Sequence, residues 1–578
     1  MVNLKINGID ISVEKGTTIL DAAKSIGIKI PTLCHLNLHE VKFHNKLAAC
    51  RVCVVEQANS SKLLPACATA CKEGMEILTD SFRAVNARRT IVELLLSNHP
   101  NSCLTCPRNL DCELQTLAHD LGIREINYEG EKSQFKIDDN SYSIVRDQNK
   151  CILCKRCITM CSEIQTCNAL TNIGRGFDTS VGSAFNIPMD ETTCTFCGQC
   201  LAVCPTGALT EVSNINKVWS AFNRKKHVFV QTAPAVRVAL GEEFSMPAGS
   251  QVTGKMVAAL RKLGFEKVFD TDFAADLTIM EEATEFVDRF TNGGKLPILT
   301  SCCPSWVNFF EHSFTDMLDI PSSAKSPHEM FGAITKTYLA EKLNLNPEDI
   351  ILVSVMPCVA KKYEAARNEL ENKNGNRDVD IVITTRELAV MIKEMGINFT
   401  ELEDEEFDDP MGESTGAGVI FGATGGVIEA TVRTAYNMIT GKDLQEIEFN
   451  ELRGINGIKE ATVDIDGTPV KIAVANGLGN ARKLLNSIRS GEKHYDAIEI
   501  MACPGGCIGG AGQPYHHGDI SILNKRAEGL YREDRMKIKR RSYENEHIQK
   551  LYKEFLGYPG SEKAHELLHT TYEAKPRR

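Results

Sequence analysis

The stretch KLPILTSCCPSW (residues 295–306) runs from a short apolar segment directly into two adjacent cysteines. Three further stretches share this layout: KHVFVQTAPA (226–235), DIILVSVMPCVAKKYEA (349–365) and YDAIEIMACPGGCIGGAGQP (495–514). Each is typical of a buried strand that ends in a motif, and the helical stretches between them indicate an α/β domain. Ligands of open α/β sheets bind beyond the carboxyl ends of the strands, so we expect the cysteines at these ends to meet. They are Cys302, Cys303, Cys358, Cys503 and Cys507.

Five thiols are one more than a 4Fe4S cube requires. Neighbouring side chains of an extended backbone point to opposite faces, so Cys302 and Cys303 are expected to differ in purpose. Counting cysteines leaves open which of the two binds metal. The alternative is a plain α/β domain whose buried cysteines act as small hydrophobic residues. The Pro- and Gly-rich turns argue against it, because backbone without side chains can approach a bulky inorganic ligand closely.

Composition indicates a folded chain of several domains. Of 578 residues, 43% are hydrophobic and 24% are charged, which excludes a mostly disordered protein. The formal net charge of −11 argues against general nucleic-acid binding, which depends on basic surfaces. The chain has no apolar run of about 18 residues, and the amino terminus, MVNLKINGIDISVEKG, lacks the layout of a signal peptide. We therefore expect a cytoplasmic protein without a membrane span.

The chain contains 22 cysteines, which in a reducing compartment indicate metal ligation rather than disulfides. The first group follows a strand-rich opening with a turn at Asn7-Gly8 and is spaced C-x15-C-x2-C-x13-C. This spacing is wider than that of plant ferredoxins, yet four thiolates on the loops of a small sheet suit a 2Fe2S cluster. The alternative, four unrelated core cysteines, is disfavoured by the close pair in CRVC. The predicted ligands are Cys34, Cys50, Cys53 and Cys67, with Cys71 as a bystander.

The next group is HPNSCLTCPRNLDC, which supplies one imidazole and three thiolates. Such a set can bind zinc tetrahedrally as well as a 4Fe4S cluster, so the motif alone does not choose the metal. Its position between other cluster motifs favours iron–sulfur. The predicted ligands are His99, Cys103, Cys106 and Cys112.

Two later runs, CILCKRCITMC and CTFCGQCLAVCP, both have the bacterial ferredoxin spacing C-x2-C-x2-C-x3-C. In that fold the fourth cysteine of each run binds the other cluster. One 4Fe4S cluster is therefore assigned to Cys151, Cys154, Cys157 and Cys204, and a second to Cys194, Cys197, Cys200 and Cys161.

The motifs TSCCPSW, MPCVAKK and MACPGGCIGGAGQP occur in this order, and by them the chain resembles the iron-iron hydrogenases over essentially its whole length. The front half also resembles the electron-input region of the large iron–sulfur subunit of respiratory complex I. The resemblance implies a multidomain α+β and α/β fold. Its expected parts are a β-grasp 2Fe2S ferredoxin-like domain (1–80), a His/Cys3 4Fe4S domain (81–130), a ferredoxin domain with two 4Fe4S clusters (140–212) and a two-lobed α/β hydrogenase body (213–578).

The family's catalytic centre, the H-cluster, is a 4Fe4S cube joined through a cysteine sulfur to a two-iron unit with CO, cyanide and a bridging dithiolate amine. The resemblance implies that the cube is bound by Cys303, Cys358, Cys503 and Cys507, with Cys507 as the bridge. Cys302 would pass protons to and from the amine. Lys361 would donate to one cyanide, Met356 and Phe421 would pack around the two-iron unit, and Pro234 with the Ala233 backbone would line the second cyanide. Ala235, His328 and Ala511 depart from frequent residues of the family, and these departures concern tuning rather than activity.

The resemblance also implies a proton route through Glu282 and Glu285 of IMEEATEF, together with Ser322 and Arg289. Glu282 and Glu285 are three residues apart and thus share a helix face. Glu281, the residue immediately before Glu282, is interpreted as part of a solvated acidic face.

The function implied is reversible hydrogen oxidation and proton reduction in anaerobic metabolism, with electrons relayed through the front-half clusters. The electron partner is left open between ferredoxin and flavin-bearing, NAD(P)H-oxidising iron–sulfur subunits of a bifurcating complex, which the carboxyl tail (531–572) favours. GATGG (422–426) lacks the context of a nucleotide-binding fingerprint, so NAD(P) or flavin would belong to a partner. H-cluster maturation proteins are further implied partners. The alternatives are a Narf-like iron–sulfur assembly protein, a sensory relative, or a complex I-type electron-transfer subunit.

Overall fold

The computed structural model describes residues 1–45, 48–372 and 375–575. The chain divides into two compact units. The first comprises Met1–Glu163, Asn168–Thr192 and Val203–Thr210, and the second comprises Ile164–Cys167, Thr193–Ala202 and Glu211–Arg578. Across the described ranges, no helix is long and apolar enough to cross a membrane.

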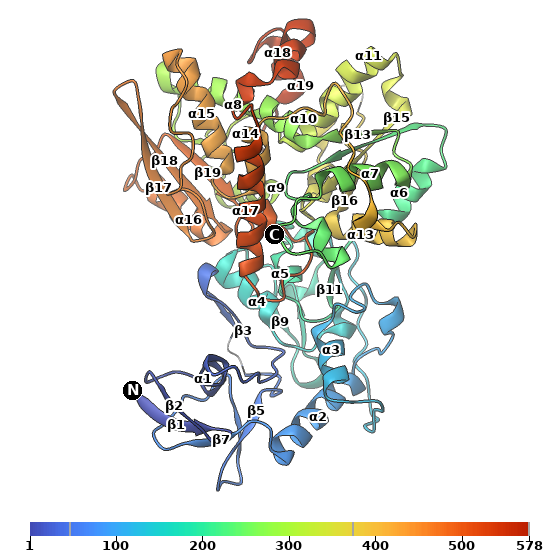
Figure 1. The fold of residues 1–578 in the computed structure, drawn as a ribbon, viewed down its shortest axis with the longest axis vertical. Coiled ribbons are helices and arrows are strands. Elements are labelled where there is room, and N and C mark those ends of the chain that lie inside the picture. Colours follow the sequence, from blue (N-terminus) through green and yellow to red (C-terminus); the bar gives the residue numbers. More distant parts are fainter. Residues whose placement is uncertain (46–47, 373–374, 576–578) are drawn as a thin grey trace. The chain divides into compact units, whose positions relative to one another are not determined.

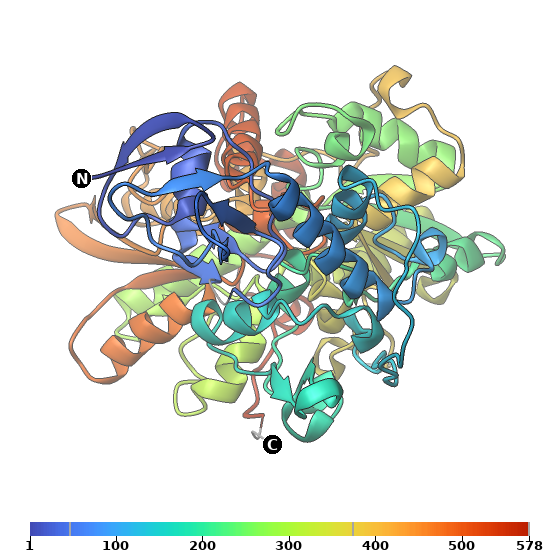
Figure 2. The same cartoon turned by 90° about the horizontal axis from the view of Figure 1, so that it is seen from below.

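The first unit begins with a five-stranded sheet of order β2-β1-β7-β5-β6 (Figure 1). Its strands are β1 (Val2–Ile6), β2 (Ile9–Val13), β5 (Val54–Gln57), β6 (Leu63–Pro65) and β7 (Glu76–Leu78). The β1–β2 turn is tight because Asn7 and Gly8 both have positive φ, as two-residue hairpins require. Helix α1 (Ile19–Ser25) lies beside this sheet (Figure 2), and its Ile19 and Ala22 pack with Leu4 and Ile77.

Short elements make up the rest of this unit. They are β3 (Leu36–Leu38), β4 (Phe43–Asn45), α2 (Phe82–Ser97), α3 (Glu113–Asp120), β8 (Ile144–Arg146), α4 (Arg156–Thr159), β9 (Thr171–Ile173) and β10 (Ser180–Gly182). Long loops between such elements are where metal ligands commonly lie.

The second unit contains two four-stranded sheets. The first has the order β13-β12-β15-β16, and all of its pairs are parallel. Its strands are β12 (His227–Thr232), β13 (Lys267–Asp270), β15 (Ile350–Met356) and β16 (Ile381–Thr384). Every residue of β15 is buried, as expected for a parallel strand covered on both faces.

The second sheet has the order β14-β19-β18-β17. Its strands are β14 (Ile298–Leu299), β17 (Ile458–Ile465), β18 (Thr468–Asn476) and β19 (Ala497–Met501). Strands β14, β19 and β18 run parallel, and β17 is an antiparallel edge strand. The two sheets form the two lobes of the unit, each with its own buried apolar cluster.

Helices connect and cover these strands. They include α5 (Gln199–Ala202), α6 (Ile215–Phe222), α7 (Thr253–Leu263), α8 (Thr271–Thr291), α9 (Pro304–Ser313), α10 (Pro327–Ile334), α11 (Ala340–Leu343), α12 (Lys361–Glu364), α13 (Thr385–Glu394), α14 (Gly416–Val419), α15 (Gly426–Thr440), α16 (Leu478–Arg489), α17 (Ser521–Met536), α18 (Glu546–Leu551) and α19 (Glu562–Leu568).

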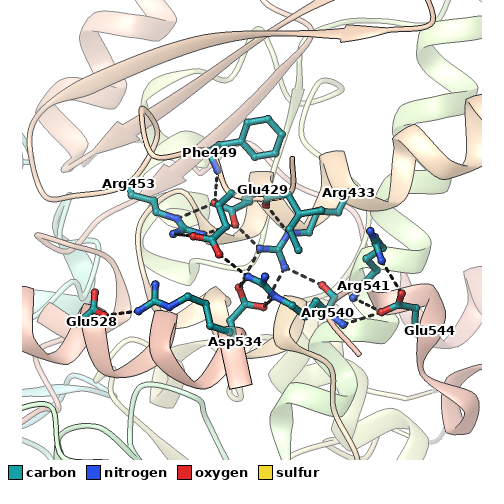
Figure 3. Close-up of polar contacts among 12 residues, drawn as sticks. Glu429, Arg433, Phe449, Arg453, Glu528, Asp534, Arg540, Arg541 and Glu544 are labelled. Atoms are coloured by element: carbon teal, nitrogen blue, oxygen red, sulfur yellow. Dashed lines mark hydrogen bonds and ion pairs between the residues drawn. The ribbon is translucent and has the colours of Figure 1, made fainter. Parts of the chain in front are cut away.

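A buried ion network joins the carboxyl-terminal helices to the body (Figure 3). Arg433 on α15 contacts Asp534 on α17 through two hydrogen bonds of 3.1 and 3.3 Å, and it also contacts Glu429. Arg540 bonds to the same Asp534 carboxylate, and Arg453 donates to Glu429 at 2.8 Å. Breaking a buried pair by removing one partner typically costs about 3–5 kcal/mol, so this network fixes α17 against α15.

Candidate active site

One cavity lies where strands of both sheets end. β12 and β15 of the first sheet and β14 and β19 of the second run into loops that line it. The residues predicted for the catalytic centre are all among its lining: Ala233, Pro234, Cys302, Cys303, Met356, Cys358, Lys361, Phe421, Cys503 and Cys507. The four strand ends therefore converge as the sequence pattern predicts.

Cys303 lies at the amino end of α9, where it is the residue before the first helical turn and Pro304 occupies the first helical position. Proline suits this position because its fixed φ is helical and its missing N–H would have no partner there. Burial raises the pKa of the Cys303 thiol, and the backbone N–H groups at Ala502 and Trp306 oppose this rise. Those N–H groups would stabilise negative charge on the sulfur.

The other cavity thiols follow β15 and β19. Burial raises the pKa of Cys358 to about 12, and nearby Cys303 adds to the rise. Between Cys503 and Cys507 the chain turns at Gly506, which has a φ of 89° and would place a Cβ only 2.7 Å from the Thr424 nitrogen. Only glycine fits such a turn.

These four thiols could not ionise together in a buried site unless a cation balanced their charge. Four convergent soft sulfur donors are the ligand set of a 4Fe4S cluster. The cavity residues therefore fit the cube of an H-cluster, with the space beside Lys361, Met356 and Phe421 left for a further group.

Cys302 also lines the cavity, next to an apolar group formed by Ala275, Ile279 and Phe421. Burial raises the pKa of the Cys302 thiol well above its usual value, and the neighbouring Cys507, Cys303 and Glu282 add to this effect. A thiol in this setting keeps its proton until an acceptor takes it.

The ammonium group of Lys361 is buried beside this pair of cysteines. Its Nζ donates to Glu364 Oε2 at 2.6 Å, to Ser326 Oγ at 2.9 Å and to the Cys302 carbonyl at 3.2 Å. Burial alone would lower the pKa of Lys361, but the Glu364 carboxylate holds it above the usual value. Sequence reasoning missed Glu364 and Ser326, although Glu364 lies three residues after Lys361 on α12.

His328 is a second nitrogen donor on the cavity wall. Its Nδ1 lies 3.0 Å from carboxylate oxygens of both Glu329 and Glu364. Burial would lower the pKa of His328, but these two carboxylates raise it above the usual value. Among the residues that the structure describes, its Nε2 has no hydrogen-bond partner.

The predicted proton route begins with Glu282, which is only 2% exposed. Within residues 1–45, 48–372 and 375–575, neither of its carboxylate oxygens has a hydrogen-bond partner. Burial raises the pKa of Glu282 to about 8, nearby Glu285 and Glu499 contribute, and the Ser301 backbone N–H opposes the rise. A carboxyl group of this kind titrates close to neutral pH, which suits a proton carrier.

Farther along α8, Glu285 forms a connected group with the other predicted residues. Ser322 Oγ donates to Glu285 Oε2 at 2.8 Å, and Arg289 donates to Glu285 Oε1. Arg289 also donates to the Ile320 carbonyl at 2.8 Å. The structure thus brings Glu285, Ser322 and Arg289 together, whereas Glu282 has no hydrogen bond to them.

Our interpretation of Glu281 as a solvated acidic position is wrong. Glu281 is only 1% exposed, because the carboxyl-terminal segment covers this side of α8. Glu281 accepts hydrogen bonds from the Tyr552 hydroxyl and from the Gly560 N–H at 2.9 Å, and His569 Nε2 lies 3.0 Å from it.

In the first unit, the cysteines assigned to a 2Fe2S cluster lie close together. The Cys53 and Cys67 sulfurs are 3.3 Å apart, and the Cys34 thiol interacts with those of Cys50 and Cys67. Cys71 lies in the apolar core of the amino-terminal sheet.

The predicted His/Cys3 site contains an imidazole suited to metal binding. Within the described ranges, the buried Nε2 of His99 has no hydrogen-bond partner. Burial lowers the pKa of His99, which favours the neutral ring that binds metals. The three thiols of this site are half-buried: Cys103, Cys106 and Cys112. Burial is the main cause of the raised pKa of Cys112, and the nearby Cys106 thiol adds a smaller rise.

The two ferredoxin-type runs are placed differently. Cys151, Cys154, Cys157 and Cys204 line one cavity of the first unit. Of the second set, Cys161 belongs to the first unit and Cys194, Cys197 and Cys200 belong to the second.

Within the second unit, the loop that carries Cys197 packs on the loop after Cys507. Gly198 has a φ of 69°, and a Cβ there would lie 2.4 Å from the Ala511 Cβ and 2.6 Å from Val359. Cys197 is also close enough to Cys503 to raise the pKa of that thiol, after the larger effect of burial. A cluster bound by this loop would therefore lie next to the cavity.

Comparison with known families gives five matches along the chain. Residues 226–511 match the C-terminal domain of the iron only hydrogenase large subunit, and residues 520–575 match the iron hydrogenase small subunit. Residues 1–81 match a 2Fe-2S iron-sulfur cluster binding domain, residues 88–127 the NADH-ubiquinone oxidoreductase-G iron-sulfur binding region, and residues 136–208 a 4Fe-4S dicluster domain. These matches confirm the predicted multidomain α+β and α/β fold.

Individual relatives match over the whole chain. The NADP-reducing hydrogenase subunit HndD of Solidesulfovibrio fructosivorans is 56% identical over 99% of both chains. Iron hydrogenase 1 of Clostridium pasteurianum is 43% identical over 99% of this chain and 100% of its own length. A solved structure of an [FeFe]-hydrogenase HydA1 variant from Chlamydomonas reinhardtii is 42% identical, with a TM-score of 0.58 over 63% of this chain and 99% of that one. By contrast, cytosolic iron-sulfur assembly component 3 of Mus musculus is 32% identical over 63% of this chain.

Proposed function

Because the chain belongs to the iron-only hydrogenase family, we propose that its cavity interconverts H₂ with two protons and two electrons at an H-cluster. The family assignment confirms the resemblance carried by the three cysteine motifs. The chain is a hydrogenase whose amino-terminal iron–sulfur domains relay electrons. The observation that supports the cavity as the catalytic site is the convergence of five thiols from two sheets, with the buried Glu282 close enough to Cys302 to raise the pKa of its thiol.

In this proposal Cys303, Cys358, Cys503 and Cys507 would hold the cube, with Cys507 as the cysteine shared with the two-iron unit. When bound, the H-cluster supplies a low-valent metal centre and a nearby amine base for splitting or forming H₂. Lys361, Met356 and Phe421 would hold the two-iron unit, and Pro234 with the Ala233 backbone would line the site of its second cyanide. The apolar wall excludes water, which strengthens the charge-assisted contact from Lys361.

Proton transfer is assigned to the chain's own side chains. The Cys302 thiol gives a proton to the cavity and regains one from Glu282, whose pKa of about 8 lets it act in both directions near neutral pH. Glu282 then exchanges protons with Ser322 and Glu285, and Arg289 orients the Glu285 carboxylate. Since Glu282 has no hydrogen bond to Ser322, this step needs a side-chain movement or an intervening water.

Electron transfer is assigned to one 2Fe2S cluster and three 4Fe4S clusters in addition to the H-cluster. The cluster that involves Cys194, Cys197 and Cys200 is the last electron carrier before the cavity, because their loop packs on the loop after Cys507. The relative HndD is named as a subunit of an NADP-reducing hydrogenase. We therefore assign the electron partners of the chain to flavin-bearing, NAD(P)H-linked iron–sulfur subunits and ferredoxin. Maturation proteins would supply the two-iron unit. A cytoplasmic location stays a prediction.

The assembly-protein alternative is weaker, since such relatives match less of the chain at lower identity. The decisive experiment is anaerobic purification from the native host, followed by infrared spectroscopy and an H₂ assay. Bands from CO and cyanide together with H₂ turnover are expected, and a protein with iron but without those bands would contradict the proposal. Flavin-bearing subunits in the same preparation would support the complex, whereas a lone active chain that reduces ferredoxin would exclude it.

A further inference from the structure

A single asparagine of the first unit joins two of the predicted cluster-binding segments. After Cys34 the chain forms the antiparallel pair β3–β4, which brings Asn45 back opposite Leu36. The Asn45 side chain is fully buried, and its Nδ2 donates to the Cys34 carbonyl at 2.7 Å and to the Cys154 carbonyl at 3.0 Å. Cys34 is a predicted ligand of the 2Fe2S cluster, whereas Cys154 is a predicted ligand of a 4Fe4S cluster. One amide group therefore connects the ligand loops of two different clusters.

The orientation of this amide is fixed by a third hydrogen bond. Thr159 Oγ1 donates to Asn45 Oδ1 at 2.7 Å. The opposite orientation would turn Oδ1 toward two carbonyl oxygens, and neither of these can donate a hydrogen bond. Thr159 lies on α4, two residues after the predicted ligand Cys157. The 4Fe4S ligand segment thus contacts Asn45 twice, through Thr159 and through the Cys154 carbonyl.

A buried arginine makes a second connection between the same segments. Arg156 donates to the His35 carbonyl at 3.2 Å, and its guanidinium also bonds to the Glu113 carboxylate at 2.7 and 2.9 Å. His35 directly follows Cys34, and Glu113 directly follows Cys112 of the His/Cys3 motif. Because Glu113 pairs with the Arg156 charge, the bond to His35 is made without leaving a buried charge unpaired.

The surroundings of these bonds are apolar. Cys34 and Cys154 belong to one buried cluster that also contains Leu33, Val52 and Leu114. Without Asn45, the two cysteine carbonyls would lose a donor in a place with little access to water, which is costly. Asparagine suits the position because its short side chain offers two donors and an acceptor, whereas aspartate offers no donor when ionised.

From this geometry we propose that Asn45 is a positioning residue for electron transfer between the 2Fe2S cluster and the 4Fe4S cluster to which Cys154 is assigned. It holds the two ligand loops at a fixed separation, and Thr159 keeps its amide in the orientation that does so. The inference rests on the proposed electron relay and adds a residue to it. In each transfer one electron leaves one cluster and enters the other, while Asn45 is neither oxidised nor reduced. Electron tunnelling weakens steeply with distance, so a looser contact between the loops slows the transfer.

The test compares Asn45→Ala, Thr159→Val and Thr159→Ser in the anaerobically purified full chain with its clusters. Each sample is mixed rapidly with H₂ and frozen, and electron paramagnetic resonance follows the reduced 4Fe4S and 2Fe2S signals. We expect the delay between these signals to lengthen about tenfold in Asn45→Ala, because small displacements of reacting groups have large effects on rate. Thr159→Val, which keeps the shape of threonine without its hydroxyl, should lengthen it less, and Thr159→Ser should behave like the parent. Asn127→Ala is the matched control, since this exposed asparagine of the same unit bonds to Glu93.

Three readouts separate positioning from a general structural role. The iron content shows whether both clusters remain bound. The midpoint potential of the 2Fe2S cluster should stay at the parent value, because Asn45 bonds to backbone carbonyls and not to the ligand sulfurs. The magnetic interaction between the two clusters, measured after reduction with dithionite, should weaken in Asn45→Ala and in Thr159→Val.

An unchanged delay in Asn45→Ala with both clusters present would overturn the proposal. So would a Thr159→Ser variant as slow as Thr159→Val, or loss of the 2Fe2S iron in both Asn45→Ala and Thr159→Val, since Asn45 would then serve cluster binding itself. Failure of the hydrogenase function has a different signature. H₂ would then reduce no cluster of the parent protein, whereas the magnetic interaction between the dithionite-reduced clusters would still depend on Asn45.

Discussion

Replacing Glu282 by glutamine is expected to stabilise the second unit and to lower turnover at the same time. Glutamine has the shape of the protonated carboxyl group but can neither ionise nor deliver a proton. Glu282 is buried and has no hydrogen-bond partner within the described ranges, and burial raises its pKa to about 8. Its ionised form is therefore strongly disfavoured in the folded protein.

The size of the stability change follows from this pKa. In the unfolded chain Glu282 ionises near its ordinary value of 4.5. Since the pKa of Glu282 is raised in the folded protein, its contribution to the free energy of unfolding is complete below about pH 4.5. That contribution is lost as the pH rises to about 8. At pH 7 the loss is about 3 kcal/mol, from 1.36 kcal/mol per pH unit. For a unit of about 380 residues, an unfolding entropy of about 0.8 kcal/mol per kelvin converts this loss to about 4 °C.

The assay is thermal unfolding of the intact chain and of Glu282→Gln at pH 5, 7 and 8, combined with H₂ turnover. The melting temperature of the variant should exceed that of the parent by an amount that grows with pH, while turnover falls about a hundredfold or more. Glu492→Gln, at an exposed position, serves as the control. Equal melting temperatures at pH 7 would refute the burial argument, and parental turnover in the variant would refute the role in proton transfer.

Three further changes test other parts of the structure. Cys302→Ala should keep the full iron content but nearly abolish H₂ turnover; a variant with normal turnover would exclude Cys302 from proton transfer. His99→Ala should remove the iron of one 4Fe4S cluster, measured by iron analysis and electron paramagnetic resonance, and unchanged iron would exclude His99 as a ligand. Asp534→Ala leaves the buried Arg433 without a carboxylate partner on α17 and should destabilise the second unit by about 3–5 kcal/mol in chemical unfolding, whereas a change below about 1 kcal/mol would show that the network carries little energy.

The sequence was most informative where spacing and chemistry coincide. A strand followed by a cysteine motif predicts both the fold and the edge of the sheet at which a ligand binds, and this held for Cys358 and for Cys503. The partners of Lys361 were harder to find, because Ser326 lies 35 residues away in the chain and the contact depends on how two loops meet.

Glu281 shows why burial could not be predicted from helical periodicity alone. Its side of α8 is covered by residues that come more than 270 positions later, including Tyr552 and His569. An acidic residue on a helix is usually solvated, and only this distant segment makes Glu281 an exception.

The two-sheet origin of the cavity has a consequence for folding. Cys358 follows a strand of one sheet, whereas Cys303, Cys503 and Cys507 follow strands of the other, so neither lobe alone carries a complete ligand set. A cube bound by all four would cross-link the lobes, and its binding energy would become folding energy. Iron loading would then be thermodynamically coupled to the packing of the two lobes, and an apoprotein would hold its lobes together less firmly than the loaded enzyme.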